Sequence, residues 1–372
     1  MIPFNKPFLI GSELKYIEQA VQSGKISGNG IFTQKCQAFF EKEYGFKKAL
    51  LTTSCTDALE MCAILANIQP GDEVIIPSYT FVSTAIAFVR QGANVIFADS
   101  CANSPNIDAN KIEALITTKT KAIVPVHYAG IACDMDKIMQ LAVKYNLIVI
   151  EDAAQAIDSY YNGKPLGSIG HLAAFSFHET KNIIAGEGGM LAINDPKYID
   201  RAEIIWEKGT NRSLFFRGEI DKYGWVDTGS SFLPSEIIAA FLWAQIENLE
   251  VIQAKRKKLW QYYYERLDAI KDDLQIQLPV VPDYATNNGH MFFIEFLNIE
   301  ERTKVIQKFK NNNILAVFHY ISLHSSPFYA DKYKGLALSN SDRFTDCLLR
   351  LPMYYELTFE QIDIVIENLI NN

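Results

Sequence analysis

The chain has 372 residues, a formal net charge of −8, 49% hydrophobic residues and 21% charged residues, a globular composition with room for two domains. This composition argues against disorder, and the acidic balance argues against the basic footprint of a nucleic-acid-binding protein. No apolar run reaches the length of a membrane span, and the first residues lack the basic and apolar regions of a secretory signal. We therefore expect a protein whose partners include neither nucleic acid nor membrane.

The cysteines and histidines point to no metal site. Six cysteines are scattered along the chain without a CxxC pair, which argues against a zinc or redox motif. Dispersed cysteines are typical of reduced thiols, so a cytoplasmic location is expected. The histidines show no metal-ligand spacing, and we assign no metal.

Apolar, β-branched runs alternate with helical patterns through the first two thirds of the chain. Helices are predicted between the early strands at 57–68, 83–92 and 137–146. The predicted buried strands are 49–54, 73–79, 94–100, 122–128, 147–153, 173–178 and 190–194. This alternation is typical of an α/β fold with a doubly wound, mostly parallel sheet.

The pattern changes near residue 235, where a helical stretch extends to residue 270 and is expected to break or bend. Strand-like runs then appear at 290–297 and 314–320, separated by helical patterns at 301–312 and 359–370. We predict a large domain over 1–245 and a smaller C-terminal α/β domain over 246–372.

An acidic pair stands at the end of one predicted strand. The apolar run LIVI leads directly into Glu151 and Asp152, and Gln155 follows. Ligands of open α/β sheets bind at the carboxyl ends of the strands, so Asp152 is a candidate ligand-binding carboxylate. The alternative is an ordinary helix N-cap.

A lysine lies between two predicted strands. Lys181 stands in SFHETKN (176–182), and the glycine-rich GEGG (186–189) leads into the next strand. Most lysines are solvated surface charges, but one held between buried strands has a lowered pKa. The neutral amine is the form that condenses with a carbonyl group, so Lys181 is a candidate nucleophile.

Two further strand ends carry candidate binding groups. Ser54, Cys55 and Thr56 stand where a helix begins, and the free amides of a helix N-terminus bind phosphate; plain capping is the other interpretation. Phe81 follows the strand at 73–79 and could stack on a planar ring, or pack in the core.

Together these groups match the needs of one cofactor, pyridoxal 5′-phosphate (PLP). PLP requires an amine for its aldehyde, a carboxylate for its pyridine nitrogen, a phosphate site and a face for stacking. Lys181, Asp152, the 54–56 turn and Phe81 would supply one each. A carboxylate beside the ring nitrogen favours the protonated ring, which is the better electron sink.

The chain also resembles a known family, the DegT–StrS sugar aminotransferases, which are fold-type-I PLP enzymes. The resemblance covers essentially the whole chain. It rests on motifs in fixed order, namely SGKISGNG (23–30), PSYTFVST (77–84), PVHYAGI (125–131), EDAAQ (151–155), SFHETKN (176–182), GEGG (186–189) and VFHYISLH (317–324). EDAAQ, SFHETK and GEGG in this order are specific.

The resemblance implies a role for each matching position. Lys181 would bond to the cofactor and move the proton, Asp152 would pair with the pyridine nitrogen, and Gln155 would lie beside the ring hydroxyl. Phe81 would stack on the ring. Phosphate contacts would come from Cys55, Thr56 and Ser176, and the substrate-side pair at the mouth of the site from His319 and Tyr320.

The sequence departs from the family in one visible place. Many relatives carry G-x-N-Y-R before the long helix, and its asparagine reaches the cofactor phosphate of the partner subunit. Here the stretch is GSSFLPSE (229–236), with Ser231 at the asparagine position and Leu233 at the arginine position. Serine still donates to phosphate, so we keep Ser231 as a cofactor contact in an expected homodimer with shared active sites. Arg212 is a candidate for the substrate's phosphates, although exposed arginines are common.

Within the family, FHETKN and the stretch at 209–223 resemble the branch that aminates dTDP-linked sugars at the 4-position. The expected reaction moves the amino group of L-glutamate to dTDP-4-dehydro-6-deoxy-D-glucose and gives dTDP-4-amino-4,6-dideoxy-D-galactose. The gluco-configured product, a 3-keto sugar enzyme and a non-catalytic PLP-binding regulator remain alternatives. A hydride-transfer enzyme is disfavoured, because no GxGxxG follows the first strand.

Overall fold

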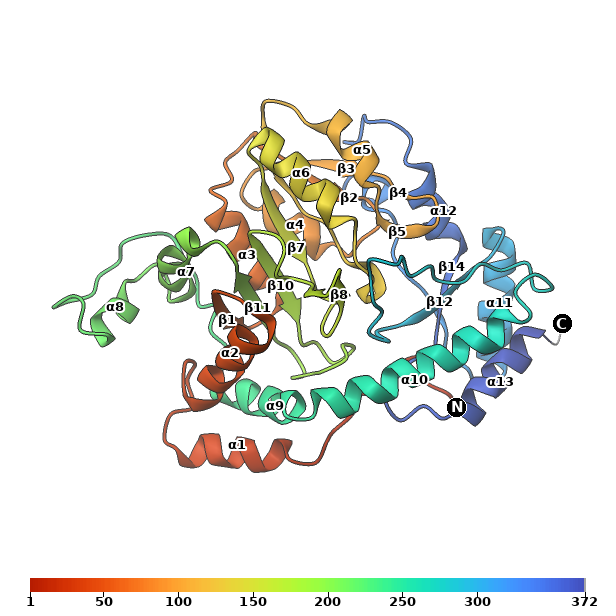
Figure 1. Cartoon of the computed structure of the whole chain (residues 1–372), viewed down its shortest axis with the longest axis horizontal. Helices are drawn as coiled ribbons and strands as arrows, with labels where there is room; N and C mark the ends of the chain where they lie inside the picture. The colour runs from red at the N-terminus through yellow and green to blue at the C-terminus, as the bar shows by residue number, and fades with distance from the viewer. Residues whose placement is uncertain (371–372) are drawn as a thin grey trace.

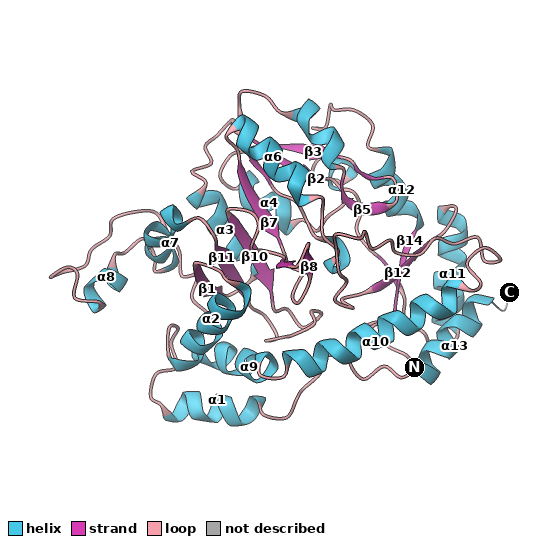
Figure 2. Ribbon diagram, in the orientation of Figure 1, coloured by secondary structure: helices cyan, strands magenta, loops and turns pink. Residues whose placement is uncertain are grey.

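The computed structural model describes residues 1–370 and is built on a central seven-stranded sheet flanked by helices (Figures 1 and 2). The spatial order of the strands is β1-β11-β10-β7-β6-β2-β3. Their bounds are β1 Lys48–Thr52, β2 Glu73–Pro77, β3 Asn94–Ala98, β6 Thr120–Ile123, β7 Ile148–Asp152, β10 Leu172–Ser176 and β11 Gly189–Ile193. Strand β11 is antiparallel to both of its neighbours, and all other pairs are parallel. The mostly parallel sheet predicted from sequence is confirmed.

Helices cover both faces of this sheet because its strands are apolar on both sides. On β2, Val74 and Ile76 join the core on one face, and Ile75 joins the core on the other. The first face packs against α3 (Cys55–Leu65), α4 (Ser83–Val89) and α7 (Ile199–Trp206). The second packs against α2 (Ile31–Tyr44), α6 (Met135–Tyr145) and α9 (Glu236–Ile246), with α1 (Glu13–Gln22) outside α9.

A second, smaller sheet of order β12-β14-β13 stands beside the first (Figure 1). Its strands, all antiparallel, are β12 Phe292–Glu295, β13 Val317–Phe318 and β14 Leu348–Leu351. Its own apolar core involves α10 (Leu249–Asp268), α11 (Ile299–Asn311) and α13 (Phe359–Ile370), while α12 (Ser339–Cys347) leads into β14. A second sheet with its own apolar core therefore forms in the C-terminal part of the chain.

The long helical stretch breaks as expected, between α9 and α10 at residues 247–248. The domain boundary that we placed at residue 245 stays a prediction. Other elements were not predicted, among them α1, α2, α7, α12, β14 and the short α8 (Arg212–Phe216). Small paired segments complete the fold: β4 Ser100–Cys101, β5 Ser104–Ile107, β8 Tyr160–Tyr161, β9 Lys164–Pro165 and α5 Ala109–Ile112.

Candidate active site

A cavity of about 770 Å³ opens at the carboxyl ends of β1, β2, β7 and β10, which lie at one edge of the sheet because these strands run in the same direction. Strand β13 and the segment after it close its other side. The cavity is lined by most of the site residues predicted from sequence, namely Lys181, Ser54, Cys55, Thr56, Phe81, Asp152, Gln155, Ser176, His319 and Tyr320.

Asp152 is a buried carboxylate at the end of β7, only 5% exposed. It accepts hydrogen bonds from Thr84 Oγ1 at 2.7 Å and from the Ala154 amide at 3.2 Å. Burial raises the pKa of Asp152 against these bonds and against the charge of Lys181. Residues 153–159 form turns, so the helix N-cap interpretation of Asp152 is wrong.

Lys181 lies on the loop between β10 and β11, at the wall of the cavity. Within residues 1–370, its Nζ makes no hydrogen bond or ion pair. Burial lowers the pKa of Lys181, and the charge of Arg350 adds to this effect, whereas Cys55 and Asp152 oppose it. Lys181 thus combines an unpaired amine with a raised fraction of the neutral, nucleophilic form.

The residue after Lys181 fixes the position of the loop. Asn182 Nδ2 donates to Gln253 Oε1 at 2.8 Å and to the Asn288 carbonyl at 2.9 Å. Its Oδ1 hydrogen-bonds to Nδ1 of His290 at 2.8 Å, and His290 also lines the cavity. These buried bonds tie the loop to α10 and to the segment before β12, which limits where Lys181 can lie.

A helix N-terminus also lines the cavity. Ser54 is the N-cap of α3 and its Oγ accepts from the Asp57 amide at 3.0 Å, so the capping interpretation is confirmed. The amides of Cys55 and Thr56 remain as donors at the positive end of the helix dipole. Gly189 lets β11 approach this turn, since a Cβ there would lie 2.3 Å from the Ser54 carbonyl carbon.

Aromatic side chains line the same cavity as Lys181. Tyr320 OH accepts from Gln155 Nε2 at 3.1 Å, and the rings of His319 and Tyr320 stand 3.6 Å apart. Tyr128 OH hydrogen-bonds to Nδ1 of His319 at 2.8 Å. Tyr320 has a φ of +66°, a left-handed conformation that a bulky residue rarely adopts and that often marks a functional site.

Phe81 and Tyr79, which follow strand β2, have different environments. Phe81 is 56% exposed and lines the cavity with its ring 6.0 Å from that of Tyr320, so the core interpretation of Phe81 is wrong. Tyr79 is buried and its hydroxyl donates to the His319 carbonyl. An exposed aromatic ring at a cavity wall suits stacking on a planar ligand.

Two predicted site residues lie outside this cavity. Arg212 is exposed on α8, in an extension of the chain that projects from the left of the body in Figure 1, with its guanidinium 4.9 Å from the Phe216 ring centre. Ser231 is exposed and bridges to Glu207 at the base of the same extension. Neither residue contributes to the site of its own chain.

Sequence reasoning missed other residues of the cavity. Thr84 lies inside α4, where nothing in the local pattern distinguishes it, and it binds Asp152. His290 precedes β12, and Arg350 lies on the unpredicted strand β14. Burial lowers the pKa of His290 well below its ordinary value, with smaller effects from Lys181 and Arg350.

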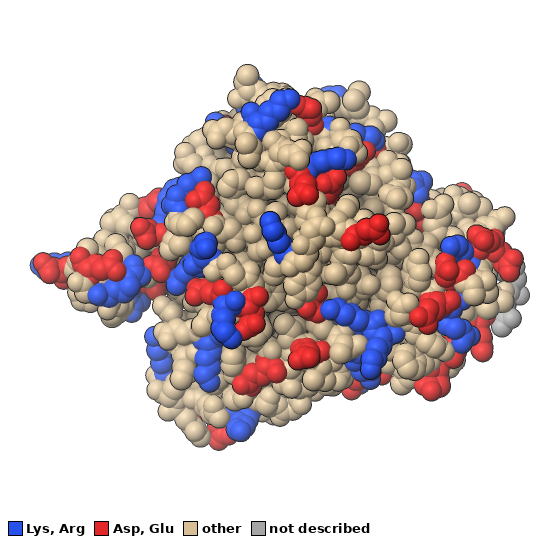
Figure 3. All heavy atoms as spheres, viewed as in Figure 1, with Lys and Arg blue, Asp and Glu red and all other residues tan. Residues whose placement is uncertain are grey.

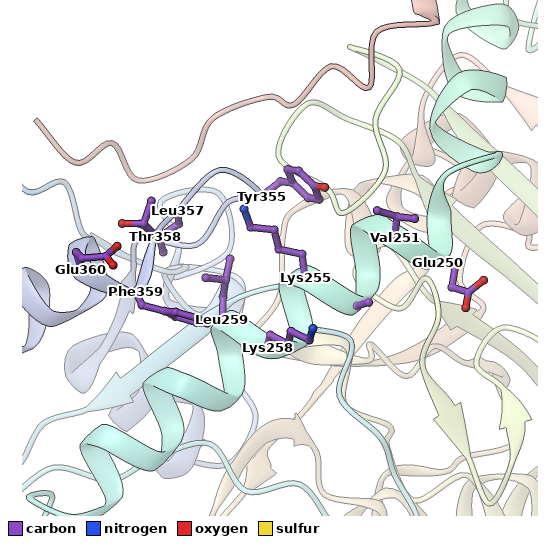
Figure 4. A pocket seen from close by; sticks show the side chains of 11 residues that line it. Glu250, Val251, Lys255, Lys258, Leu259, Tyr355, Leu357, Thr358, Phe359 and Glu360 are labelled. Atoms are coloured by element: carbon purple, nitrogen blue, oxygen red, sulfur yellow. The ribbon is translucent and has the colours of Figure 1, made fainter.

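A second hollow, of about 750 Å³, lies between α10 and the start of α13 (Figure 4). Its walls are mostly apolar, and Lys255 spans part of it with Nζ 4.9 Å from the Tyr355 ring centre. None of its lining residues belongs to the central strands, and it contains no buried acid beside an unpaired amine. The chemistry therefore points to the cavity around Lys181.

Other classes of site receive no support from the surface. On the face seen in Figure 3, acidic and basic residues are interspersed, without the broad basic patch of a nucleic-acid-binding protein. Among residues 1–370, none of the helices has the length and hydropathy needed to cross a bilayer. The same residues bring no three His, Cys, Asp or Glu side chains together as a metal site.

The chain matches the DegT/DnrJ/EryC1/StrS aminotransferase family over residues 8–370. The chain belongs to this family. It is 33% identical over 371 residues to GDP-perosamine synthase from Caulobacter vibrioides, covering 97% of this chain and 95% of the relative. Two similar solved structures are DesV from S. venezuelae (28% identity, TM-score 0.90, 99% and 97% covered) and Spr1654 from Streptococcus pneumoniae in its PLP form (26%, 0.88, 99% and 97%).

Family membership confirms three expectations from the sequence. The fold is that of the fold-type-I aminotransferases, the cofactor is PLP, and the protein is a PLP-dependent nucleotide-sugar aminotransferase.

The cavity of this family member fits the cofactor. In the part of the chain that the structure describes, Asp152 has no ion-pair partner, and a buried carboxylate without a cation suits the protonated pyridine ring of PLP. The amides of Cys55 and Thr56 at the start of α3 suit its phosphate. Lys181, which lines the same cavity, supplies the unpaired amine.

Proposed function

We propose that this aminotransferase moves the amino group of L-glutamate to the 4-keto carbon of dTDP-4-dehydro-6-deoxy-D-glucose and gives dTDP-4-amino-4,6-dideoxy-D-galactose. The observation that carries the proposed transfer is the unpaired amine of Lys181 in one cavity with buried Asp152 and the N-terminus of α3. The choice of the 4-position rests on FHETKN and the stretch at 209–223, which resemble the 4-aminating branch of the family.

The cavity has the size and composition for such substrates. Its volume of about 770 Å³ is within the range of small-molecule sites, and it holds few charged groups besides Lys181 and Arg350. A sugar ring that bears no charge is compatible with the aromatic wall of Phe81 and Tyr320. The charged nucleotide would extend toward the open mouth of the cavity.

Each site residue takes a defined part in this proposal. PLP, when bound, supplies an aldehyde that accepts the amino group and a ring that delocalises the electrons released at the neighbouring carbon. Lys181 Nζ would accept the proton from the α-carbon of the donor in its neutral form and would carry it as an ammonium group until it is returned. Asp152 would hold the proton on the ring nitrogen, and Gln155, which donates to Tyr320 OH, would hold the ring hydroxyl.

The remaining side chains position the cofactor and enclose the substrates. The amides of Cys55 and Thr56, with the hydroxyl of Ser176, bind the phosphate, and Ser54 orients that turn by capping α3. His319 and Tyr320 line the substrate side. After 2-oxoglutarate leaves, the keto sugar enters the same cavity and Lys181 moves the proton in the reverse direction, which predicts ping-pong kinetics.

We also propose a homodimer in which the extension at 209–230 and Ser231 complete the partner's site. The extension exposes apolar surface, since Phe216, Tyr223 and Trp225 are 67%, 51% and 84% exposed. Arg212 lies on the same extension, outside its own cavity. Sedimentation at assay concentration tests the assembly, and a fully active monomer would contradict it.

A GDP-linked sugar is a second candidate substrate, favoured by the 33% identity to GDP-perosamine synthase. A 3-keto sugar and the gluco-configured product are further alternatives. One experiment separates them: the purified enzyme is incubated with L-glutamate and either dTDP-4-dehydro-6-deoxy-D-glucose or its GDP-linked counterpart, and the product is identified by NMR. The position and configuration of the new amine decide among the candidates.

The same assay tests the role of Lys181. Lys181→Ala should lower turnover at least about 1,000-fold, because both proton transfers lose their carrier. A Lys181→Ala enzyme with near-normal turnover would refute the assignment. Loss of turnover with unchanged circular dichroism would exclude misfolding as the cause.

A further inference from the structure

His290 is a buried histidine at the wall of the active-site cavity, and one of its ring nitrogens has no partner. The residue is 3% exposed and stands just before β12. Its backbone is held on both sides, since its amide donates to Asn288 Oδ1 at 3.0 Å and its carbonyl accepts from Arg256 Nη2 at 2.8 Å. The ring bonds through Nδ1 to Asn182 Oδ1 at 2.8 Å. Within residues 1–370, Nε2 of His290 makes no hydrogen bond.

The bond to Asn182 determines which nitrogen of the His290 ring carries the proton. Asn182 Nδ2 donates to the Asn288 carbonyl at 2.9 Å, and a backbone carbonyl can only accept, so the orientation of the Asn182 amide is fixed. Its Oδ1 is therefore an acceptor, and Nδ1 of His290 must be the donor. Burial lowers the pKa of His290 well below its ordinary value, which keeps the ring neutral. Nε2 is thus left as a hydrogen-bond acceptor with a free lone pair.

The reacting amine of Lys181 is the charged group most closely associated with this acceptor. Asn182 directly follows Lys181, so the bond at 2.8 Å ties the His290 ring to the loop that carries the amine. Among the charges that act on the pKa of His290, Lys181 has the largest effect. For His319, which also lines the cavity, the effect of Arg350 is larger than that of Lys181. His290 is therefore associated with the amine, and His319 with the arginine.

An ammonium group on Lys181 needs an acceptor in this cavity. A buried positive charge is costly, and the charge of Arg350 adds to the cost. The side-chain oxygen of Gln155 is occupied, since it accepts from a backbone amide at 2.6 Å, and Asp152 is proposed to serve the cofactor's ring nitrogen. The neutral ring of His290 offers a free lone pair and adds no further positive charge.

We propose that His290 Nε2 accepts a hydrogen bond from the Lys181 ammonium group and holds it in place between the two proton transfers. This inference deepens the proposed function, since it assumes that Lys181 carries the proton. In the structure neither atom has a partner, so the contact forms when Nζ is free and protonated. The proton stays on Nζ, because an amine is a stronger base than this buried imidazole. His290 is thus a positioning residue that acts through Lys181.

Two substitutions separate the two nitrogens of the His290 ring. Asparagine places an amide near the position of Nδ1 and can keep the bond to Asn182, but it has no group at the position of Nε2. Glutamine places its amide oxygen near the position of Nε2 and gives up the bond to Asn182. The other groups that act on the pKa of Lys181 are unchanged in both variants, namely Cys55, Arg350 and Asp152.

The first readout is the pKa of Lys181 in the full-length apo-enzyme, which needs neither cofactor nor turnover. It is measured from the pH dependence of acetylation of Lys181 by acetic anhydride, followed by mass spectrometry. His290→Asn should lower this pKa by about one to two units, because the ammonium form loses a hydrogen bond. His290→Gln should leave it within about half a unit of the wild type, because an acceptor remains.

The second readout is the kinetics of the two half-reactions. His290→Asn should lower kcat at least about tenfold with L-glutamate and with the keto sugar alike, because Lys181 carries the proton in both, while each KM stays within about threefold. His290→Gln should recover most of this loss. A rise in KM for one substrate with kcat unchanged would mean that His290 binds that substrate, and would overturn the proposal.

The remaining outcomes are also decisive. If His290→Asn leaves the pKa of Lys181 and kcat unchanged while His290→Gln lowers both, His290 serves only to hold Asn182, and the proposal fails. An equal change in both variants would overturn it as well, because the effect would not follow the Nε2 position. Nitrogen-15 NMR of the wild-type histidine side chains needs no variant and should show His290 protonated on Nδ1; a proton on Nε2 would refute the inference. Failure of the proposed function would appear instead as a wild type that transfers no amino group from L-glutamate, while the apo-enzyme pKa still tests the contact.

Discussion

Thr84→Val tests how the chain sets the acidity of Asp152. Thr84 is fully buried, and its hydroxyl donates to Asp152 Oδ2 at 2.7 Å. Valine has nearly the same shape but cannot donate. The buried carboxylate would keep only the longer bond from the Ala154 amide at 3.2 Å.

The magnitude follows from the type of bond that is lost. A hydrogen bond to a charged group contributes about 1.5–3 kcal/mol, and one pKa unit corresponds to about 1.4 kcal/mol. The pKa of Asp152, already raised by burial, should therefore rise by a further one to two units or so. Asp152 must be ionised to leave the proton on the ring nitrogen, so activity is present above this pKa and is lost as pH falls through it.

The assay is the pH dependence of the half-reaction with L-glutamate. In Thr84→Val, the acidic limb should move up by about one to two pH units, and below it the rate should be about 10- to 100-fold lower than that of the wild type at the same pH. Thr80→Val is the matched control. Thr80 Oγ1 hydrogen-bonds to Thr84 Oγ1 at 2.9 Å, one step removed from Asp152, and its removal should shift the limb by less than about half a unit. An unchanged acidic limb in Thr84→Val, or an equal shift in both variants, would refute the reasoning.

Three further predictions follow from local geometry. Gly189→Ala should weaken PLP binding at least about tenfold in a fluorescence titration. The added Cβ would lie 2.3–2.4 Å from backbone atoms of Ser54 and Cys55 and would therefore push this turn away. An unchanged affinity would contradict this prediction. Glu236→Gln should lower the free energy of unfolding in urea by about 2–4 kcal/mol, since the buried carboxylate accepts hydrogen bonds from three backbone amides at the start of α2. A loss below about 0.5 kcal/mol would contradict this prediction. Finally, the rate at which apo-enzyme is reconstituted with PLP should increase with pH and level off below the ordinary lysine pKa of 10.5. Burial lowers the pKa of Lys181, and the neutral amine is the form that reacts. A rate that still rises above pH 10.5 would show that Lys181 is an ordinary lysine.

The cofactor half of the site was accessible from the sequence for a physical reason. Parallel strands bring their carboxyl ends to one edge of a sheet, so residues that directly follow apolar strands converge there. Ser54 and Asp152 lie at the ends of strands that the apolar pattern predicts, Lys181 lies shortly after another, and all three line one cavity. Local pattern and tertiary position agree at these residues.

The substrate half was less accessible because its strands are short. β14 has four residues, and the arginine among its three leucines gives no clear period of two, so the strand and Arg350 were missed together. Thr84 shows the other limit, since a threonine within a short helix gains its role only through a contact with a residue 68 positions away. Arg212 and Ser231 lie outside the cavity of their own chain, so any role that they have depends on the surface of a partner subunit.

The division of the cavity between two sheets bears on how its specificity is set. The residues proposed to hold the cofactor follow strands of the large sheet, whereas Phe318, His319, Tyr320 and Arg350 come from the small sheet and the segment after β13. Hydrogen bonds join the two halves, since Tyr79 from the end of β2 binds the His319 carbonyl. Substitutions on the small sheet can therefore alter substrate choice while the groups that hold PLP stay in place.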